Sequence, residues 1–404
     1  MVLEASDGVG GRVRTDEWDG FLLDRGFQVL FTAYPAARRQ LDYERLDLRR
    51  YEPGALICQG NQRHLLTDPL RDPGSALPAV LSPLVPFADK LRTFRLTEEI
   101  KRTSLETIFK GPDSTTETYL REQGFSEAHL DNFLRRFFGG IFLSTTLQTS
   151  SQAFRFYWKM LSEGDTVVPA RGMGQISWQL AEELIAGGRI FFRNRVAKLH
   201  RATSDGRVVG AVTEDGETFE ADITVLAVPA PEAARLTELS TPEGNVGTVT
   251  LYFAGDAPIT PAKKIILHAN RHTFLNNVAP VTNIAPEQAP AGKHLLAAST
   301  IGVPEGDDHS LFQRAMHDLR RMFAGDKEAL AALETYQPLT LYRIPYAQFA
   351  QPPGIYSQLP GSTTDIPGLL FASEFTGGSN LNATMVSGEN AARIVLQSGV
   401  SKTA

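Results

Sequence analysis

An acid-ended strand followed by a glycine-rich turn opens the chain, and this combination constrains its fold more than any other feature. Val2-Leu3-Glu4 reads as the end of a buried strand, and Gly10-Gly11 follows closely. A dinucleotide-binding βαβ unit places an acid at the end of its second strand, where the carboxylate accepts hydrogen bonds from ribose hydroxyls. Adjacent glycines let the backbone approach a phosphate closely, and nearby arginines supply positive charge. The first candidate binding residues are therefore Glu4, Gly10, Gly11, Arg12 and Arg14.

The pattern of strands and helices changes several times along the chain. Residues 34–161 read as mainly helical, 162–246 as strands with an amphipathic helix, and 247–350 as strands with one clear helix. We predict an α/β protein in which a Rossmann-like nucleotide-binding domain is interleaved with an α+β substrate domain. The nucleotide-binding domain takes residues 1–33, 162–246 and 351–404, and the substrate domain takes residues 34–161 and 247–350.

Three local patterns give specific expectations for secondary structure. Residues 126–138 read as a helix opened by a serine cap, and residues 189–199 read as one strand. The helix before Gly187-Gly188 is expected to bury one face, formed by Ile176, Leu180, Ala181 and Leu184.

Composition excludes several classes of partner and site. The chain has 404 residues and a formal net charge of −6, so it lacks the basic surface that neutralises nucleic-acid phosphates. A single cysteine, Cys58, forms no internal disulfide and has no Cys or His neighbours that would complete a metal site, so we expect a small buried hydrophobe and no metal. No basic leader and no run of 18 apolar residues occurs, which predicts a cytoplasmic protein. Oligomeric state leaves no mark in the sequence.

An apolar, proline-bearing segment at residues 77–87 has two interpretations. A basic amphipathic stretch follows it, so the segment is either a membrane-dipping entrance for an apolar substrate or a buried connection within the substrate domain. The buried connection is the favoured interpretation, and a peripheral membrane contact is the alternative.

The run VLEASDGVGGRVRT resembles the second half of the FAD-binding motif of the flavin amine oxidase and phytoene desaturase superfamily. DRGFQVL is similar to the Asp-x-Gly segment that lies near the flavin in this superfamily, and Arg195-Val196 matches a valine whose backbone contacts adenine. The resemblance implies bound FAD. It adds to the cofactor-binding candidates Gly26, Phe27, Gln28 and Val196.

The closing run FASEFTGGSNLNATMVSGEN is similar to the superfamily's C-terminal signature, an acid followed by Ser/Asn-Leu-Asn at a helix start. The acid is Glu374 where relatives usually carry Asp, and Ala383 stands where many carry glycine. These differences displace the contacts without removing them. The resemblance adds Glu374, Asn382, Ala383 and Met385 to the cofactor-binding candidates.

The GxGxxG segment that precedes the acid-ended strand in the superfamily is absent from this sequence. That segment supplies a central strand and the helix N-terminus that holds the pyrophosphate. We interpret its absence as a misassigned start codon, and we expect the upstream reading frame to encode GxGxxG.

The resemblance implies hydride transfer from a substrate carbon to flavin N5. No acid/base pair stands out, and the histidines at 200, 268, 272, 294 and 309 read as scattered and unpaired. Tyr346, on a strand before the closing motif, and Lys264 or its neighbour Lys263 are weak catalytic candidates. Aromatic runs at 137–142 and 154–158 line an apolar cavity or form core. The expected substrate is an apolar small molecule, with isoprenoid or carotenoid desaturation ahead of amine oxidation; a flavin-binding isomerase or a non-catalytic relative is the alternative.

Overall fold

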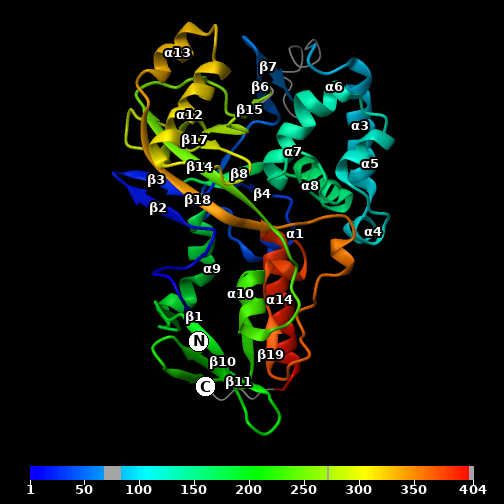
Figure 1. The fold of residues 1–404 in the computed structure, drawn as a ribbon, viewed down its shortest axis with the longest axis vertical. Coiled ribbons are helices and arrows are strands. Elements are labelled where there is room, and N and C mark those ends of the chain that lie inside the picture. The colour runs from blue at the N-terminus through cyan, green and yellow to red at the C-terminus, as the bar shows by residue number, and fades with distance from the viewer. Residues whose placement is uncertain (68–82, 271–272, 400–404) are drawn as a thin grey trace.

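The fold divides into a lower and an upper body in Figure 1, with both chain ends in the lower one. The structure is a computed structural model that describes residues 1–67, 83–270 and 273–399. The chain crosses between the bodies several times, so segments far apart in sequence meet where the bodies join (Figure 1).

The lower body is built from short strands and three helices. Two parallel pairs form separate two-stranded sheets, β1 with β9 and β13 with β19, and β10, β11 and β12 form an antiparallel sheet. The strands are β1 (Val2–Glu4), β9 (Ile190–Phe192), β10 (Val196–Arg201), β11 (Val208–Thr213), β12 (Thr218–Glu220), β13 (Thr224–Leu226) and β19 (Leu369–Phe371). The helices are α9 (Gly174–Ala186), α10 (Ala230–Thr237) and α14 (Leu381–Gln397).

A seven-stranded mixed sheet forms the centre of the upper body, in the order β18-β14-β17-β16-β15-β6-β7. Its strands are β6 (Ala55–Gln59), β7 (Gln62–Leu66), β14 (Asn245–Gly255), β15 (Ile265–His268), β16 (Asn277–Pro280), β17 (His294–Ser299) and β18 (Gln337–Phe349). Smaller sheets connect the bodies: β2 (Thr15–Trp18) with β3 (Phe21–Asp24), and β4 (Leu30–Phe31) with β8 (Thr166–Pro169) and β5 (Leu48–Arg50).

Helices cover the upper sheet and its flank. They are α1 (Pro35–Gln40), α3 (Phe87–Arg102), α4 (Leu105–Lys110), α5 (Thr116–Glu122), α6 (Glu127–His129), the π-helical η2 (Leu130–Leu134), α7 (Arg135–Phe142), α8 (Ser151–Glu163), α11 (Val281–Ile284), α12 (Asp308–Met322) and α13 (Lys327–Leu333). Short 3-10 turns are η3 (Pro286–Gln288), η4 (Ile355–Ser357) and η5 (Glu374–Thr376).

The two faces of the large sheet have different neighbours. Alternate residues of β14, such as Leu251 and Phe253, pack with Leu311 and Leu319 of α12 in a closed apolar core. The intervening residues, including Thr250, face the opposite side, because successive side chains of a strand alternate between faces. That opposite side is where a cavity lies.

Buried Asp24 anchors the junction between the bodies. Its Oδ1 accepts hydrogen bonds from Thr15 Oγ1 (2.6 Å) and Met173 N (2.8 Å), which ties β3 to the turn before α9. Tyr252 Oη, on β14 of the large sheet, donates to the Asp24 carbonyl at 2.8 Å, which links the large sheet to the same junction. Burial raises the pKa of the Asp24 carboxyl from 3.8 to about 6.

Several predicted strands and helices are present, but their bounds or their buried faces differ from the prediction. The strand expected over 189–199 is two strands, because Arg193 adopts a left-handed backbone with φ of 58° that breaks the ladder. Ser126 does cap a helix, but that helix passes through π-helical η2 before α7. Leu180 is 45% exposed and so does not share the buried face of Ile176. Strands β5 to β7 lie in a region expected to be helical.

Cys58 is fully buried in β6, as expected for a small hydrophobe, and burial raises the pKa of its thiol to about 12. Of the apolar segment 77–87, residues 77–82 lie outside the described residues. In the described part of the chain, no helix combines the length and apolar character needed to cross a membrane.

Candidate functional site

The opening strand places Glu4 at the wall of the cavity. β1 runs parallel to β9, with Glu4 opposite Phe192. Glu4 Oε1 accepts from the Ser6 backbone N–H at 2.7 Å, and the Glu4 carbonyl accepts from Asn194 N at 2.9 Å. The carboxylate lines the cavity at the end of a parallel strand, where a ribose-binding acid is expected.

The glycine turn after it requires glycine at one position. Gly10 has φ of 108°, and a Cβ there would lie 2.3 Å from the Val13 carbonyl oxygen and 2.7 Å from Ser177 Oγ. Gly11 has φ of 54°, but a Cβ there would meet no atom within 4 Å. Both glycines line the cavity, so the turn presents bare backbone to it.

Arg12 joins the opening turn to the closing segment of the chain. Its Nη2 lies 2.6 Å from Glu374 Oε1, and its Nη1 donates to the Ala347 carbonyl at 2.6 Å. The guanidinium carbon also lies 5.4 Å from the centre of the Tyr346 ring. Glu374 is 6% exposed, and its Oε2 accepts from Ser379 Oγ at 2.8 Å. The sequence-predicted residues Arg12 and Glu374 thus meet, and any contact of Arg12 with a phosphate stays a prediction.

Residues 26–28 form a wall of the cavity that contacts both bodies. Gly26 has φ of 100°, Phe27 N donates to Thr250 Oγ1 at 3.3 Å, and Gln28 Nε2 donates to the Arg12 carbonyl at 2.8 Å. All three residues line the cavity, and their place beside a bound flavin stays a prediction.

Helix α14 points its N-terminus at the cavity. Asn380 caps the helix, since its Oδ1 accepts from Ala383 N at 2.9 Å. Ser379, Asn380, Leu381 and Thr384 line the cavity. The N-terminus of this 17-residue helix provides free N–H groups and a positive dipole end, which suit a pyrophosphate. We missed Asn380 in the sequence, although an Asn before an apolar helical run is a capping signal.

Five predicted cofactor-binding residues do not line the cavity. Arg14 Nη1 donates to Asp7 Oδ1 at 2.8 Å, and Asn382 Oδ1 accepts from Ala36 N at 2.9 Å. On α14, residues three apart share a face, so Leu381 and Thr384 face the cavity while the positions between them turn toward α1 and the core. The residues away from the cavity are Arg14, Val196, Asn382, Ala383 and Met385.

Neither catalytic candidate reaches the cavity wall. Tyr346 packs against the lower-body core, and its buried hydroxyl makes no well-aligned hydrogen bond. Lys264 is 2% exposed, donates to the Pro53 carbonyl at 2.8 Å and lies 3.4 Å from Glu52 Oε2. Lys263 and Lys264 precede β15 in an irregular stretch, as expected of a loop.

His268 corrects the expectation of unpaired rings, and His272 lies outside the described residues. His268 is fully buried on β15, and its Nδ1 lies 3.5 Å from Asp318 Oδ2. The large sheet packs against α12 there, which brings the pair together. His129, which we missed, lines the cavity between Phe125 and Phe133, and burial lowers its pKa to about 4.

The cavity has a volume of about 1080 Å³ and joins both bodies. Its lower end is formed by the glycine turn, Glu4 and the start of α14. Its upper end is mainly apolar and runs between the large sheet and helices α3, α7 and α8, lined by Phe31, Tyr34, Phe94, Phe133, Phe137, Phe138, Ile141, Trp158 and Leu161. The aromatic run at 137–142 therefore contributes both to the cavity and to the core.

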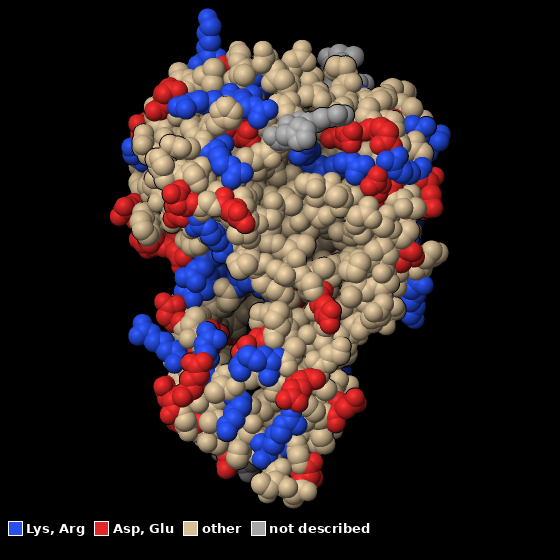
Figure 2. Space-filling model, viewed as in Figure 1, with Lys and Arg blue, Asp and Glu red and all other residues tan. Residues whose placement is uncertain are grey.

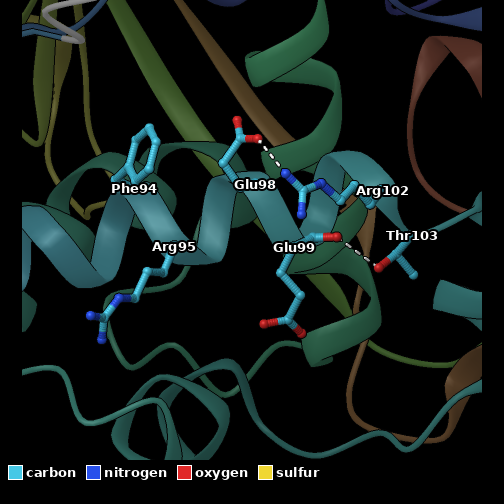
Figure 3. Close-up of a pocket in the computed structure, with 6 residues that line it drawn as sticks. All are labelled: Phe94, Arg95, Glu98, Glu99, Arg102 and Thr103. Atoms are coloured by element: carbon cyan, nitrogen blue, oxygen red, sulfur yellow. Dashed lines mark hydrogen bonds and ion pairs between the residues drawn. The ribbon is translucent and has the colours of Figure 1, made fainter.

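A shallow hollow of about 580 Å³ lies on the outer side of α3. Figure 3 shows Glu98 turned toward Arg102 along this helix, with Phe94 one turn earlier. Phe94 and Glu98 line both this hollow and the large cavity, so the hollow marks the outer mouth of the cavity.

The family described as flavin-containing amine oxidoreductase matches residues 1–396. The chain belongs to this family. It is an FAD-dependent oxidoreductase, and the predicted cofactor and enzyme class are confirmed. The glycine turn, the acid on β1 and the N-terminus of α14 are the parts of this chain that fit FAD.

Solved structures of the same fold confirm the α/β class. An oxidoreductase from Methanosarcina mazei aligns with a TM-score of 0.73 and 20% identity, covering 98% of this chain and 93% of that one. Putrescine oxidase bound to putrescine aligns with a TM-score of 0.70 and 18% identity, with coverage of 98% and 93%. A putative protoporphyrinogen oxidase from Exiguobacterium sp. 255-15 aligns with a TM-score of 0.67 and 17% identity, covering 98% of this chain and 92% of that one. No curated protein matches the chain.

Proposed function

We propose that this amine oxidoreductase family member oxidises a mainly apolar small molecule, with desaturation of an isoprenoid or carotenoid-like chain as the favoured reaction. One observation carries the proposal: aromatic and aliphatic side chains form the upper cavity from the Phe27 wall to the mouth at α3. A long apolar chain gains free energy by leaving water for such a lining.

The residues of the chain position the substrate and exclude water. When bound, FAD supplies the hydride acceptor for the oxidation. Gly26, Phe27 and Gln28 form a cavity wall that contacts both bodies, and the hydrogen bonds of Phe27 N and Gln28 Nε2 fix this wall. Phe138 and Trp158 stack at 5.7 Å behind it, which gives the apolar end a rigid wall.

Amine oxidation is the second candidate, favoured by the family to which the chain belongs. The carboxylates that line the cavity argue for placing it second. Glu374 pairs with Arg12, Glu52 lies near Lys264, and Glu98 lies near Lys101 and Arg102. Glu4 lies at the lower end, away from the apolar walls. An ammonium group in the upper cavity would therefore compete with existing partners.

Anaerobic mixing of the FAD-loaded protein with substrate tests the proposal. We expect phytoene to bleach the flavin absorbance faster than putrescine does. Bleaching by putrescine alone would favour amine oxidation instead. If neither compound bleaches the flavin although both bind, the isomerase or non-catalytic alternative is favoured.

We also propose that substrate reaches the mouth of the cavity from a membrane surface. Phe87, Leu91 and Phe94 of α3 are 74%, 44% and 50% exposed, and their spacing places them on one face. Lys90 and Arg95 lie beside them. Figure 2 shows acidic and basic residues interspersed over this view, with a broad uncharged area on the upper body. Sedimentation with anionic phosphatidylserine vesicles should fall in a Phe87→Ser/Phe94→Ser double variant; equal sedimentation would remove the proposal.

A further inference from the structure

A row of polar side chains crosses the floor of the mainly apolar upper cavity. Thr250 of β14 lies opposite Ser299 of β17, and Ser299 lies opposite Asn277 of β16. Directly paired residues of antiparallel strands project to the same face, so the three side chains form one row. All three line the cavity and are at most 5% exposed. The row begins at the wall formed by residues 26–28, since Thr250 Oγ1 accepts from Phe27 N.

Asn276 and Asn277, at the end of this row, have unused hydrogen-bonding atoms. Asn276 Nδ2 donates to the Arg136 carbonyl and to Asn277 Oδ1, each at 3.1 Å. The carbonyl contact fixes which end of the Asn276 amide carries nitrogen, and Asn276 in turn orients Asn277. Asn276 Oδ1 and Asn277 Nδ2 are then left buried without a hydrogen-bond partner among the residues that the structure describes. The pair therefore holds one free acceptor beside one free donor.

The packing of α7 holds this pair in place. A Cβ on Gly140 would lie 2.9 Å from Asn276 Nδ2 and 3.2 Å from Asn277 Oδ1, so the glycine lets the helix rest directly on both amides. Both asparagines line the cavity and are at most 5% exposed. A buried amide atom without a hydrogen-bond partner is less stable than one that is hydrogen-bonded. Most buried polar groups in folded proteins are hydrogen-bonded, so a pair of unused atoms beside a cavity calls for a partner that the chain itself does not supply.

We propose that Asn276 and Asn277 recognise a neutral polar group of the substrate that both donates and accepts a hydrogen bond, namely a hydroxyl or a carboxamide. Such a group donates to Asn276 Oδ1 and accepts from Asn277 Nδ2. An ammonium group donates only and leaves Asn277 Nδ2 unpaired, and a hydrocarbon pairs with neither. The inference rests on the proposed oxidation of an apolar molecule and adds that the preferred substrate carries a polar end, which the hydrocarbon phytoene lacks.

Isothermal titration of the FAD-loaded protein tests this with probes of equal chain length: octane, octan-1-ol, octanamide and octylamine. Asn277→Leu keeps the volume and removes the donor. We expect it to weaken octan-1-ol and octanamide by about tenfold and to leave octane unchanged or tighter. Retained octane binding shows that the variant is folded. Equal affinity of the wild type and Asn277→Leu for the alcohol and the amide would overturn the proposal.

A second variant tests the direction of the hydrogen bonds. Asn277→Asp keeps the acceptor for Asn276 Nδ2 and replaces the free donor by an acceptor, so octylamine should gain affinity relative to octan-1-ol. An unchanged ratio between these two probes would contradict the proposed geometry. Probe binding is measured without turnover. If substrate bleaches the flavin but the probes bind without preference for the alcohol and the amide, only this inference is overturned. If the probes show that preference but no substrate bleaches the flavin, only the proposed oxidation is overturned.

Discussion

Arg12 Nη2 lies 2.6 Å from Glu374 Oε1 across a separation of more than 360 residues in sequence. The contact joins the turn after β1 to the segment before α14, and both segments line the lower end of the cavity. Since Glu374 is 6% exposed and Arg12 retains some solvent contact, the ion pair is partly screened. The ion pair still brings the predicted N-terminal glycine turn and the predicted C-terminal signature together in one site.

Replacing Arg12 by alanine should lower the free energy of unfolding by about 2–4 kcal/mol and weaken FAD binding. The substitution leaves Glu374 buried beside the cavity with only Ser379 as a partner, and an uncompensated buried carboxylate is costly. Urea unfolding and FAD titration measure the two effects.

Arg14→Ala is the matched control for this change. Arg14 pairs with Asp7, whose side chain is 60% exposed, so its loss should change stability by less than about 1 kcal/mol. Equal losses in the Arg12 and Arg14 variants would contradict a structural role for the Arg12–Glu374 pair.

Gly10→Ala should destabilise the protein and abolish FAD binding, whereas Gly11→Ala should cost only about 1 kcal/mol. A Cβ at Gly10 would overlap the Val13 carbonyl and Ser177 Oγ, while a Cβ at Gly11 meets open space. Thermal unfolding and FAD titration of both variants compare a steric effect with a purely conformational one. Equal losses of stability and of FAD binding in the two variants would contradict the steric requirement for glycine at position 10.

The sequence allowed prediction of features that depend on neighbouring residues. Glu4 at the end of a strand and the Gly10 turn follow from local acid and glycine patterns, and each lies where expected. Glycine and strand-end signals are local because they depend on backbone conformation and on the alternation of side chains.

Features that depend on tertiary contacts could not be predicted. Which residues at the start of α14 face the cavity depends on how the helix packs on α1, so Asn382 was chosen and Asn380 missed. His268 and Asp318 are 50 positions apart and meet only because α12 packs on the large sheet. Asn276 and Asn277 carry no motif, and their position against Gly140 exists only in the fold.

Asp24→Asn should raise stability at neutral pH and flatten the pH dependence between 3.8 and about 6. Because burial raises the pKa of Asp24 in the folded protein, the folded state binds more protons than the unfolded state in this range. The contribution of Asp24 to stability therefore falls as pH rises through it, by about 2–3 kcal/mol in total. The asparagine Oδ1 still accepts from Thr15 and Met173. Urea unfolding at several pH values should show the difference; parallel profiles for the two proteins would contradict it.

Tyr346→Phe should leave the flavin spectrum, turnover and stability nearly unchanged. The hydroxyl makes no well-aligned hydrogen bond, and burial raises its pKa to about 12, so it does not ionise near neutral pH. The phenylalanine ring keeps the contact with Arg12. Steady-state kinetics and absorbance spectra check this, and a marked fall in kcat would restore Tyr346 as a catalytic residue.

Titration of FAD into the purified, folded protein decides whether the cavity is a flavin site, with bound flavin followed by its absorbance bands and by quenching of its fluorescence. We expect saturable binding by the wild type and by Arg14→Ala, with loss of binding in Gly10→Ala. If the folded wild type binds no FAD, the cavity between the glycine turn and α14 is not a flavin site, and the account is wrong.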